Sequence, residues 1–166
     1  CGHLQMGGQL RRHPLGDRRL GAGVRPRCGD PPPRQGRIGR AFDGVVGGGT
    51  RLGTLTITNA NNVTADFAIT AANIVQTAGQ GTTTFTGALD TNTAGGIDLN
   101  GSVFTINNTV NTTAGGPVMI TNSGLLTIAA AGDMTLDSAF TQDGTGSMNV
   151  AGDITTTADG ITFTRT

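Results

Sequence analysis

A short repeat in the middle of the chain restricts its fold more than any other feature. The tetrapeptide T-A-G-G occurs at Thr93–Gly96 and again at Thr113–Gly116. Between the two copies, apolar residues alternate with Thr and Asn, a pattern typical of β-strands with one buried face. Gly and Asn supply the positive φ angles that tight corners need. Repetition of such a unit predicts a repeat architecture.

Two further series indicate the length of the repeat. Ala-Gly pairs begin at positions 78, 94, 114, 131 and 151, so that successive steps are 16, 20, 17 and 20. Phenylalanines at 67, 85, 104 and 140 give steps of 18, 19 and 36, the last being two periods. The shared F-x-G of A-F-D-G-V (41–45) and T-F-T-G-A-L (84–89) marks equivalent places in two copies. We therefore predict repeat units of about 16–20 residues, within the range of repeat architectures.

The composition of the repeat region favours strands over helices. The chain contains no Lys and no Glu, and Arg is missing from residues 52–164. Strand-like runs include T-L-T-I-T (54–58), V-F-T-I-N (103–107) and L-L-T-I-A (125–129). Two or three such runs per unit predict an all-β fold, a parallel β-helix (β-solenoid) of about six rungs whose stacked rungs bury a common core. An antiparallel β-sandwich is the main alternative.

Specific residues follow from this prediction. The expected core consists of the phenylalanines Phe67, Phe85, Phe104 and Phe140 with neighbouring aliphatic residues. Between the two T-A-G-G copies we expect Ile97, Leu99, Val103, Phe104 and Ile106 to be buried. Phe67, Phe85 and Phe104 would form an aromatic ladder with a spacing of about 4.8 Å per rung.

Residues 1–40 have a different composition. They hold nine of the eleven Arg, both Cys, both His and five of the six Pro, whereas residues 52–164 contain eight Asp and no basic residue. Apolar residues are sparse and show no period, so we expect residues 1–40 to be a disordered Arg/Gly/Pro-rich segment and residues 41–166 to form the solenoid. All-Arg basicity with dense Gly and Pro is also what GC-rich codons read out of frame would give.

Three functional readings of residues 1–40 compete with disorder. An Arg-rich arm suggests nucleic-acid binding, but aromatic residues are absent, so we expect no nucleic-acid partner. Cys1, His3, His13 and Cys28 match no closed structural zinc pattern. A Cys1–Cys28 disulfide remains open for a protein outside the cell. The chain lacks an apolar run of the length that spans a membrane, so no membrane span is expected.

Residues 42–166 resemble the repeat regions of large bacterial surface proteins, the filamentous-haemagglutinin-like and autotransporter-passenger-like adhesins. The stretches that carry the resemblance are residues 42–63, 76–89, 120–137 and 140–156. The resemblance implies a right-handed β-helix, secretion across an outer membrane, and an extracellular role in adhesion or as a stalk. The secretion signal, capping region and membrane anchor of that family are not seen in this chain.

Candidate chemical sites are few. Between residues 52 and 164 only Asp can act as acid or base, with Asp133 and Asp137 close in sequence, and no nucleophile motif or phosphate-binding loop occurs. Asp133 and Asp153, on matching A-G-D corners, together with Asp143 are weak candidates for a calcium site. T-x-T pairs at Thr54–Thr58, Thr84–Thr86 and Thr162–Thr164 suggest an ice-binding array, but they do not recur in every unit.

Trp and Tyr, the usual anchors of sugar and protein binding, are absent. The sequence therefore predicts a non-enzymatic stalk or spacer without a cofactor, in a protein whose unknown host-surface or matrix ligand is bound by other parts. A calcium-stabilised surface-binding module and a polysaccharide-active enzyme are the alternatives.

Overall fold

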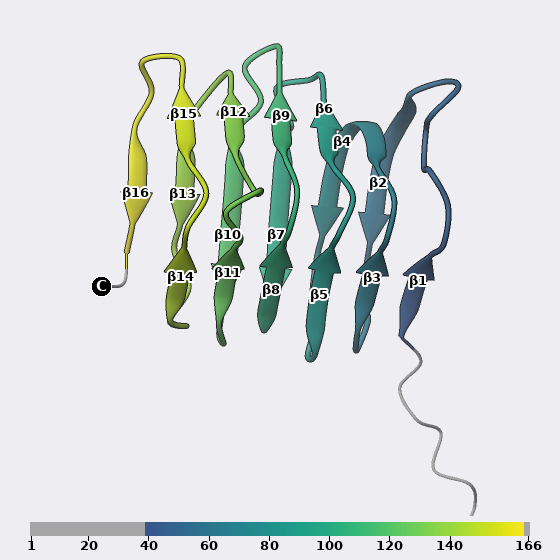
Figure 1. The fold of residues 1–166 in the computed structure, drawn as a ribbon, viewed down its shortest axis with the longest axis horizontal. Coiled ribbons are helices and arrows are strands. Elements are labelled where there is room, and N and C mark those ends of the chain that lie inside the picture. The colour runs from purple at the N-terminus through teal and green to yellow at the C-terminus, as the bar shows by residue number, and fades with distance from the viewer. Residues whose placement is uncertain (1–38, 165–166) are drawn as a thin grey trace, which may run out of the picture. The chain divides into compact units, whose positions relative to one another are not determined.

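The computed structural model describes residues 39–164, which form a parallel β-solenoid of six rungs (Figure 1). Every pairing between its named strands is parallel. The predicted solenoid is therefore confirmed, and the antiparallel sandwich is excluded. The first strand begins at Arg40. The candidate ligands Cys1, His3, His13 and Cys28 lie outside the described residues.

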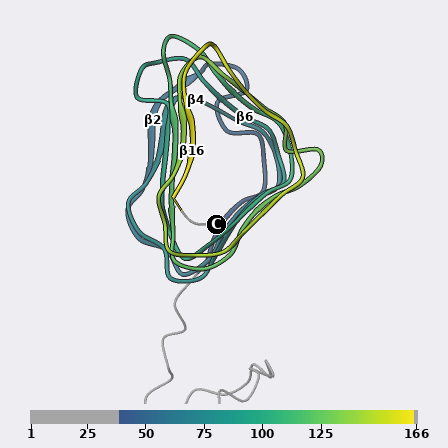
Figure 2. The same ribbon diagram turned by 90° about the vertical axis from the view of Figure 1, so that its left-hand side faces the viewer.

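Each rung contributes to three walls, and the rungs superpose as loops when seen along the stack (Figure 2). Wall A consists of β1 (Arg40–Phe42), β3 (Val63–Ala65), β5 (Thr82–Phe85), β8 (Val103–Ile106), β11 (Leu126–Ile128) and β14 (Met148–Val150). Wall B consists of the bridge residue Val46, the first half of β4 (Ile69–Gln76), β6 (Leu89–Thr91), β9 (Val110–Thr112), β12 (Met134–Leu136) and β15 (Ile154–Thr156). Wall C consists of β2 (Leu52–Ile57), the second half of β4, β7 (Ile97–Gly101), β10 (Val118–Asn122), β13 (Phe140–Gln142) and β16 (Ile161–Phe163).

Strand β4 joins walls B and C into one ten-stranded sheet. Its residues Ile69 and Ala71 pair with β6, whereas Ile74 and Gln76 pair with β7. In the other complete rungs a corner separates the two walls. The second rung therefore turns from wall B to wall C without leaving its strand.

The core follows the alternation seen in the sequence. In β10, Val118, Ile120 and Asn122 are buried and the residues between them are exposed. Ile97, Leu99, Phe104 and Ile106 are buried as predicted. Val103 differs: it is half-buried, because it stands at an outward position beside Thr82.

The prediction of a phenylalanine ladder is wrong. Phe85, Phe104 and Phe140 are fully buried, but Phe67 is 49% exposed in the corner between β3 and β4. The strand partners of Phe85 are Ala65 and Ile106, and those of Phe104 are Thr83 and Leu126, so neither ring stacks on the other. The aromatic contact in the described part of the chain joins Phe140 to Phe163, with ring centroids 5.5 Å apart.

The predicted F-x-G equivalence is confirmed. Phe42 and Phe85 occupy the same register position on wall A, two rungs apart, with Ala65 between them. The predicted length of the rung is too short, however. The register runs through Val63, Thr83, Phe104, Leu126 and Met148, whose sequence numbers increase by 20, 21, 22 and 22.

The predicted rung length is too short because the Ala-Gly pairs lie at three different corners. Ala78 follows β4 at the corner from wall C to wall A. Ala94 and Ala114 lie between walls B and C, and Ala131 and Ala151 lie between walls A and B. Only the steps within one corner, from 94 to 114 and from 131 to 151, measure a rung, and the two steps are equal.

Candidate functional site

The three aspartates predicted as calcium ligands are divided between two corners. Asp133 and Asp153 directly precede β12 and β15, so they occupy equivalent places in successive rungs. The Asp153 backbone N–H donates to Asp133 Oδ1 at 3.0 Å. Asp143 follows β13, at the corner between walls C and A, and its Oδ1 accepts a hydrogen bond from Thr121 Oγ1 at 3.0 Å. The Asp133 and Asp143 carboxylates thus accept hydrogen bonds from groups of the solenoid, and Asp143 lies at a different corner from Asp133 and Asp153.

The pair considered for acid–base chemistry is also separated. Asp133 and Asp137 flank the two ends of β12, so their Cα atoms are about 13 Å apart in an extended strand. Asp137 Oδ2 accepts the Gly115 N–H at 2.9 Å, which engages it in the neighbouring corner. Residues 39–164 hold no group of three or more His, Cys, Asp or Glu side chains that could bind a metal ion.

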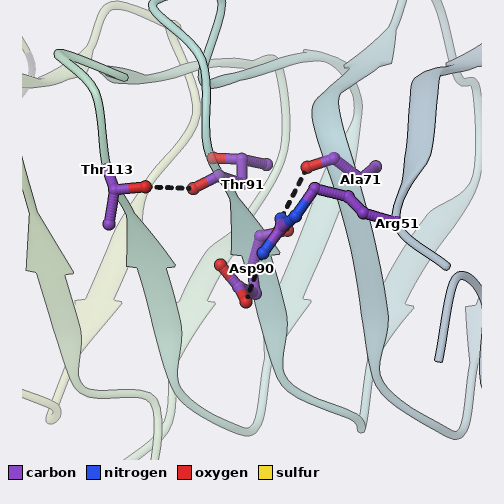
Figure 3. A network of polar contacts seen from close by, with 5 residues as sticks. All are labelled: Arg51, Ala71, Asp90, Thr91 and Thr113. Carbon is purple, nitrogen blue, oxygen red and sulfur yellow. Dashed lines mark hydrogen bonds and ion pairs between the residues drawn. The ribbon is translucent and has the colours of Figure 1, made fainter. Parts of the chain in front are cut away.

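Arg51 is held by an ion-pair network on wall B (Figure 3). Its Nη1 donates to the backbone oxygens of Ala71 and Asp90, both at 2.9 Å, and its Nη2 donates to Asp90 Oδ2 at 2.8 Å. The three rungs that contain Arg51, Ala71 and Asp90 are thereby linked by one side chain. Both partners are partly exposed, so the ion pair itself adds little stability.

Polar side chains also enter the interior, beside the corner between walls C and A. Thr83 Oγ1 donates to Gln76 Oε1 at 3.0 Å, and Gln76 Nε2 donates to the Asn100 oxygen at 3.3 Å. Further along, Gln142 Nε2 donates to Asn122 Oδ1 at 2.7 Å and to the Gly144 oxygen at 3.1 Å. These amides satisfy carbonyls where the chain leaves the sheet. They contain no group that titrates near neutral pH, so the arrangement is suited to structure rather than to proton transfer.

The T-x-T pairs considered for an ice-binding array do not form one. Thr54–Thr58 and Thr162–Thr164 lie at opposite ends of wall C, and Thr84–Thr86 begins on wall A. The strand register instead aligns four threonines on the outer surface of wall A, of which only Thr84 belongs to the T-x-T pairs: Thr64, Thr84, Thr105 and Thr127. This column is not apparent in the sequence because its spacing lengthens by one residue at each rung, so that it becomes visible only once the rung length is known.

Comparison with known proteins found no matching family model, no matching curated protein and no matching solved structure. No helix in residues 39–164 is long and apolar enough to cross a membrane. The candidate aspartates and threonines are distributed over different walls and corners of the solenoid. The best-defined surface is the uncharged outer column of wall A, made of polar side chains of one type.

Proposed function

We propose that this chain is a segment of the rigid stalk of a secreted or cell-surface bacterial protein of the adhesin type, and that it acts outside the cell as a spacer without catalysing a reaction. The observation that supports this proposal is the continuity of the stack. Backbone hydrogen bonds connect each rung to the next, for example from Phe104 N–H to the Leu125 oxygen at 3.0 Å and from Leu126 N–H to the Ser147 oxygen at 2.9 Å.

Such a stack suits a spacer for a physical reason. Length increases by about 4.8 Å with each rung, and every inner rung is held on both sides by hydrogen bonds and shared core contacts. The surface fits the same role, because the aspartates are dispersed and the chain has neither Trp nor Tyr. In this proposal, adhesion to a host surface or matrix belongs to other parts of a larger protein.

Rigidity can be measured as a distance between two spin labels. Ala41 and Asn149 occupy the same outward register position on wall A in the first and sixth rungs, through Thr64, Thr84, Thr105 and Thr127. In the full chain carrying Cys1→Ser and Cys28→Ser, labels at Ala41→Cys and Asn149→Cys should give one narrow distribution that corresponds to five rung steps, about 24 Å between backbones. Labels at Ala41→Cys and Thr127→Cys should shorten this distance by one rung step.

A broad distribution, or one that does not shorten with the second pair, would contradict the spacer role.

The extracellular setting is tested separately. Antibodies against residues 39–164 should stain intact cells that make the protein, whereas staining that requires permeabilisation would place the stalk inside the cell and remove that half of the proposal.

A further inference from the structure

The first and second rungs are joined less extensively on wall B than on the other two walls. On wall A, β1 pairs with β3 over three residues, and on wall C, β2 pairs with β4 over five. On wall B, within the described residues, the first rung contributes an isolated bridge between Val46 and Ile69 in place of a strand. The backbone hydrogen bonds of this joint run from the Val46 N–H to the Ala68 oxygen at 2.9 Å and from the Thr70 N–H to the Val46 oxygen at 2.8 Å.

After Val46 the chain leaves wall B as a glycine-rich strap, which we define as residues 47–51 (G-G-G-T-R). Gly47 has a φ of 76°, and a Cβ atom there would meet the Thr70 oxygen, so the strap begins close against the second rung. A Cβ atom on Gly49, in contrast, would meet no atom within 4 Å. The middle of the strap is therefore loosely packed, and its far end, Arg51, has to hold it in place.

The far end of the strap is attached where strand β4 bends from wall B to wall C. Ala71 of β4 stands opposite Thr91 of β6, and in the hydrogen-bond phase of this parallel ladder the Asn92 N–H would donate to the Ala71 oxygen. Because of the bend, the Asn92 N–H donates instead to the Ala72 oxygen, at 3.3 Å. The Ala71 oxygen is thus left for another donor, which the Arg51 guanidinium supplies.

Arg51 attaches the strap to the next two rungs at once (Figure 3). Its Nη1 donates to the Ala71 and Asp90 backbone oxygens, both at 2.9 Å, and its Nη2 donates to Asp90 Oδ2 at 2.8 Å. The two bonds to backbone oxygens come from a charged donor and should contribute more than the partly exposed ion pair. The strap therefore takes the place of a wall B strand in the first rung.

We propose that the strap is a latch. With Arg51 in place, wall B stays closed between the first and second rungs; when Arg51 is released, this joint opens while walls A and C stay paired, so that the joint becomes a hinge. Wall C is held independently, because Asn73 Nδ2 donates to Thr54 Oγ1 at 2.9 Å beside the five pairs of β2 and β4. This inference concerns the joint alone and does not depend on the proposed stalk function.

Hydrogen exchange of single amides, followed by nuclear magnetic resonance on the full chain, reports the opening of each wall. The Val46 and Thr70 amides report wall B. The Asp66 amide, at the end of β3, and the Thr77 amide, at the end of β4, donate to the first rung on walls A and C and report those walls. Local opening speeds exchange only at the amides whose hydrogen bonds it breaks.

Three variants test the latch. Arg51→Gln removes the charged fork and should raise the exchange rates of the two wall B amides about tenfold or more, while the wall A and wall C amides stay within about twofold. Asp90→Asn keeps both backbone oxygens for Arg51 and should raise the wall B rates by about two- to threefold, because an exposed ion pair contributes little. Arg40→Gln is the matched control, since it removes the other Arg of the described residues, and it should leave all four rates unchanged.

Unchanged wall B rates in Arg51→Gln overturn the inference. An equal rise at all four amides also overturns it, because the first rung would then open as one unit, and so does an equal rise in Arg40→Gln, which would indicate an effect of net charge. If Arg51→Gln does not fold by far-ultraviolet circular dichroism, Asp90→Asn decides. A rise confined to the wall B amides supports the latch, whereas no rise or a uniform one overturns it.

Discussion

Two buried threonines differ in whether their hydroxyl group has a partner. Thr83 is 3% exposed, and its Oγ1 donates to Gln76 Oε1 at 3.0 Å. Thr91 is fully buried, and its Oγ1 has no hydrogen-bond partner among the described residues. A buried hydroxyl without a partner has lost its hydration and gained nothing in return, so the same residue type stabilises the interior at one site and destabilises it at the other.

Substitution by valine, which keeps the shape and removes the hydroxyl, should separate the two sites. Thr91→Val should raise the free energy of unfolding by about 1 kcal/mol. Thr83→Val should lower it by about 1–3 kcal/mol, because it leaves Gln76 Oε1 buried and unpaired. Urea unfolding followed by circular dichroism measures both. Equal losses in the two variants would show that the Thr91 hydroxyl has a hydrogen-bond partner after all.

Burial of single residues was predictable where alternation within a strand determined it. Ile97, Leu99, Phe104 and Ile106 alternate with outward residues and are buried. The spacing of Phe67 from Phe85 predicts a core position, but Phe67 follows Asp66 outside any strand. Hydrophobicity and spacing along the chain do not show whether a residue lies in a strand or a corner, and only the register distinguishes them.

At the scale of elements, the corners depend on neighbours that the repeat does not show. Both T-A-G-G copies are closed by a hydrogen bond from the last Gly N–H to the Thr oxygen, at 3.0 Å for Thr93 and 3.3 Å for Thr113. The first copy has positive φ at Gly96, but the second has it at Ala114 and Gly115. The second copy precedes Pro117, and a residue before proline avoids the α region, so the left-handed residues move back along the turn.

Glycines at corners also allow successive rungs to approach each other. A Cβ atom on Gly87 would meet the backbone carbonyl of Phe67 in the preceding rung. Gly87→Ala should therefore lower the free energy of unfolding by about 1–3 kcal/mol, the usual cost of overpacking. Gly53→Ala is the control, because its Cβ would have no atom within 4 Å.

The control should change the free energy of unfolding by less than about 1 kcal/mol, with stabilisation if the backbone of β2 accepts alanine without strain. Urea midpoints of the two variants at a common slope give the comparison. Equal midpoints would mean that the rungs at the Phe67 corner move apart at no cost, contrary to the packing described.

The sequence was sufficient for the architecture but not for the arrangement of its elements. Alternating short strands and recurring small-residue corners predicted a parallel solenoid of about six rungs, since only stacking buries one face of each short strand. The three-wall organisation was not predictable, because the three corners use similar residues. The rung length, the fused strand β4 and the threonine column of wall A all depend on assigning each corner to its place.

At the scale of the whole molecule, the carboxylates are dispersed over the surface. Asp133 and Asp153 share one corner, while Asp137 and Asp143 hydrogen bond elsewhere. Residues 39–164 contain nine Asp and two Arg, and one of these, Arg51, forms an ion pair with Asp90. This surplus of negative charge should affect stability through the summed field of the solenoid rather than through one bound cation. Dispersed surface charges interact weakly with one another and are screened by salt.

Sodium chloride and calcium chloride should therefore raise the melting temperature by the same amount at equal ionic strength, and a chelator added at constant ionic strength should leave it unchanged. A calcium site at the stacked A-G-D corners predicts a different result, since a ligand that binds the folded state stabilises it increasingly as its own concentration rises. Calcium would then give the larger rise, and Asp133→Asn and Asp153→Asn, but not Asp143→Asn, would abolish the excess. That pattern would replace the dispersed field by a specific site at the corner between walls A and B.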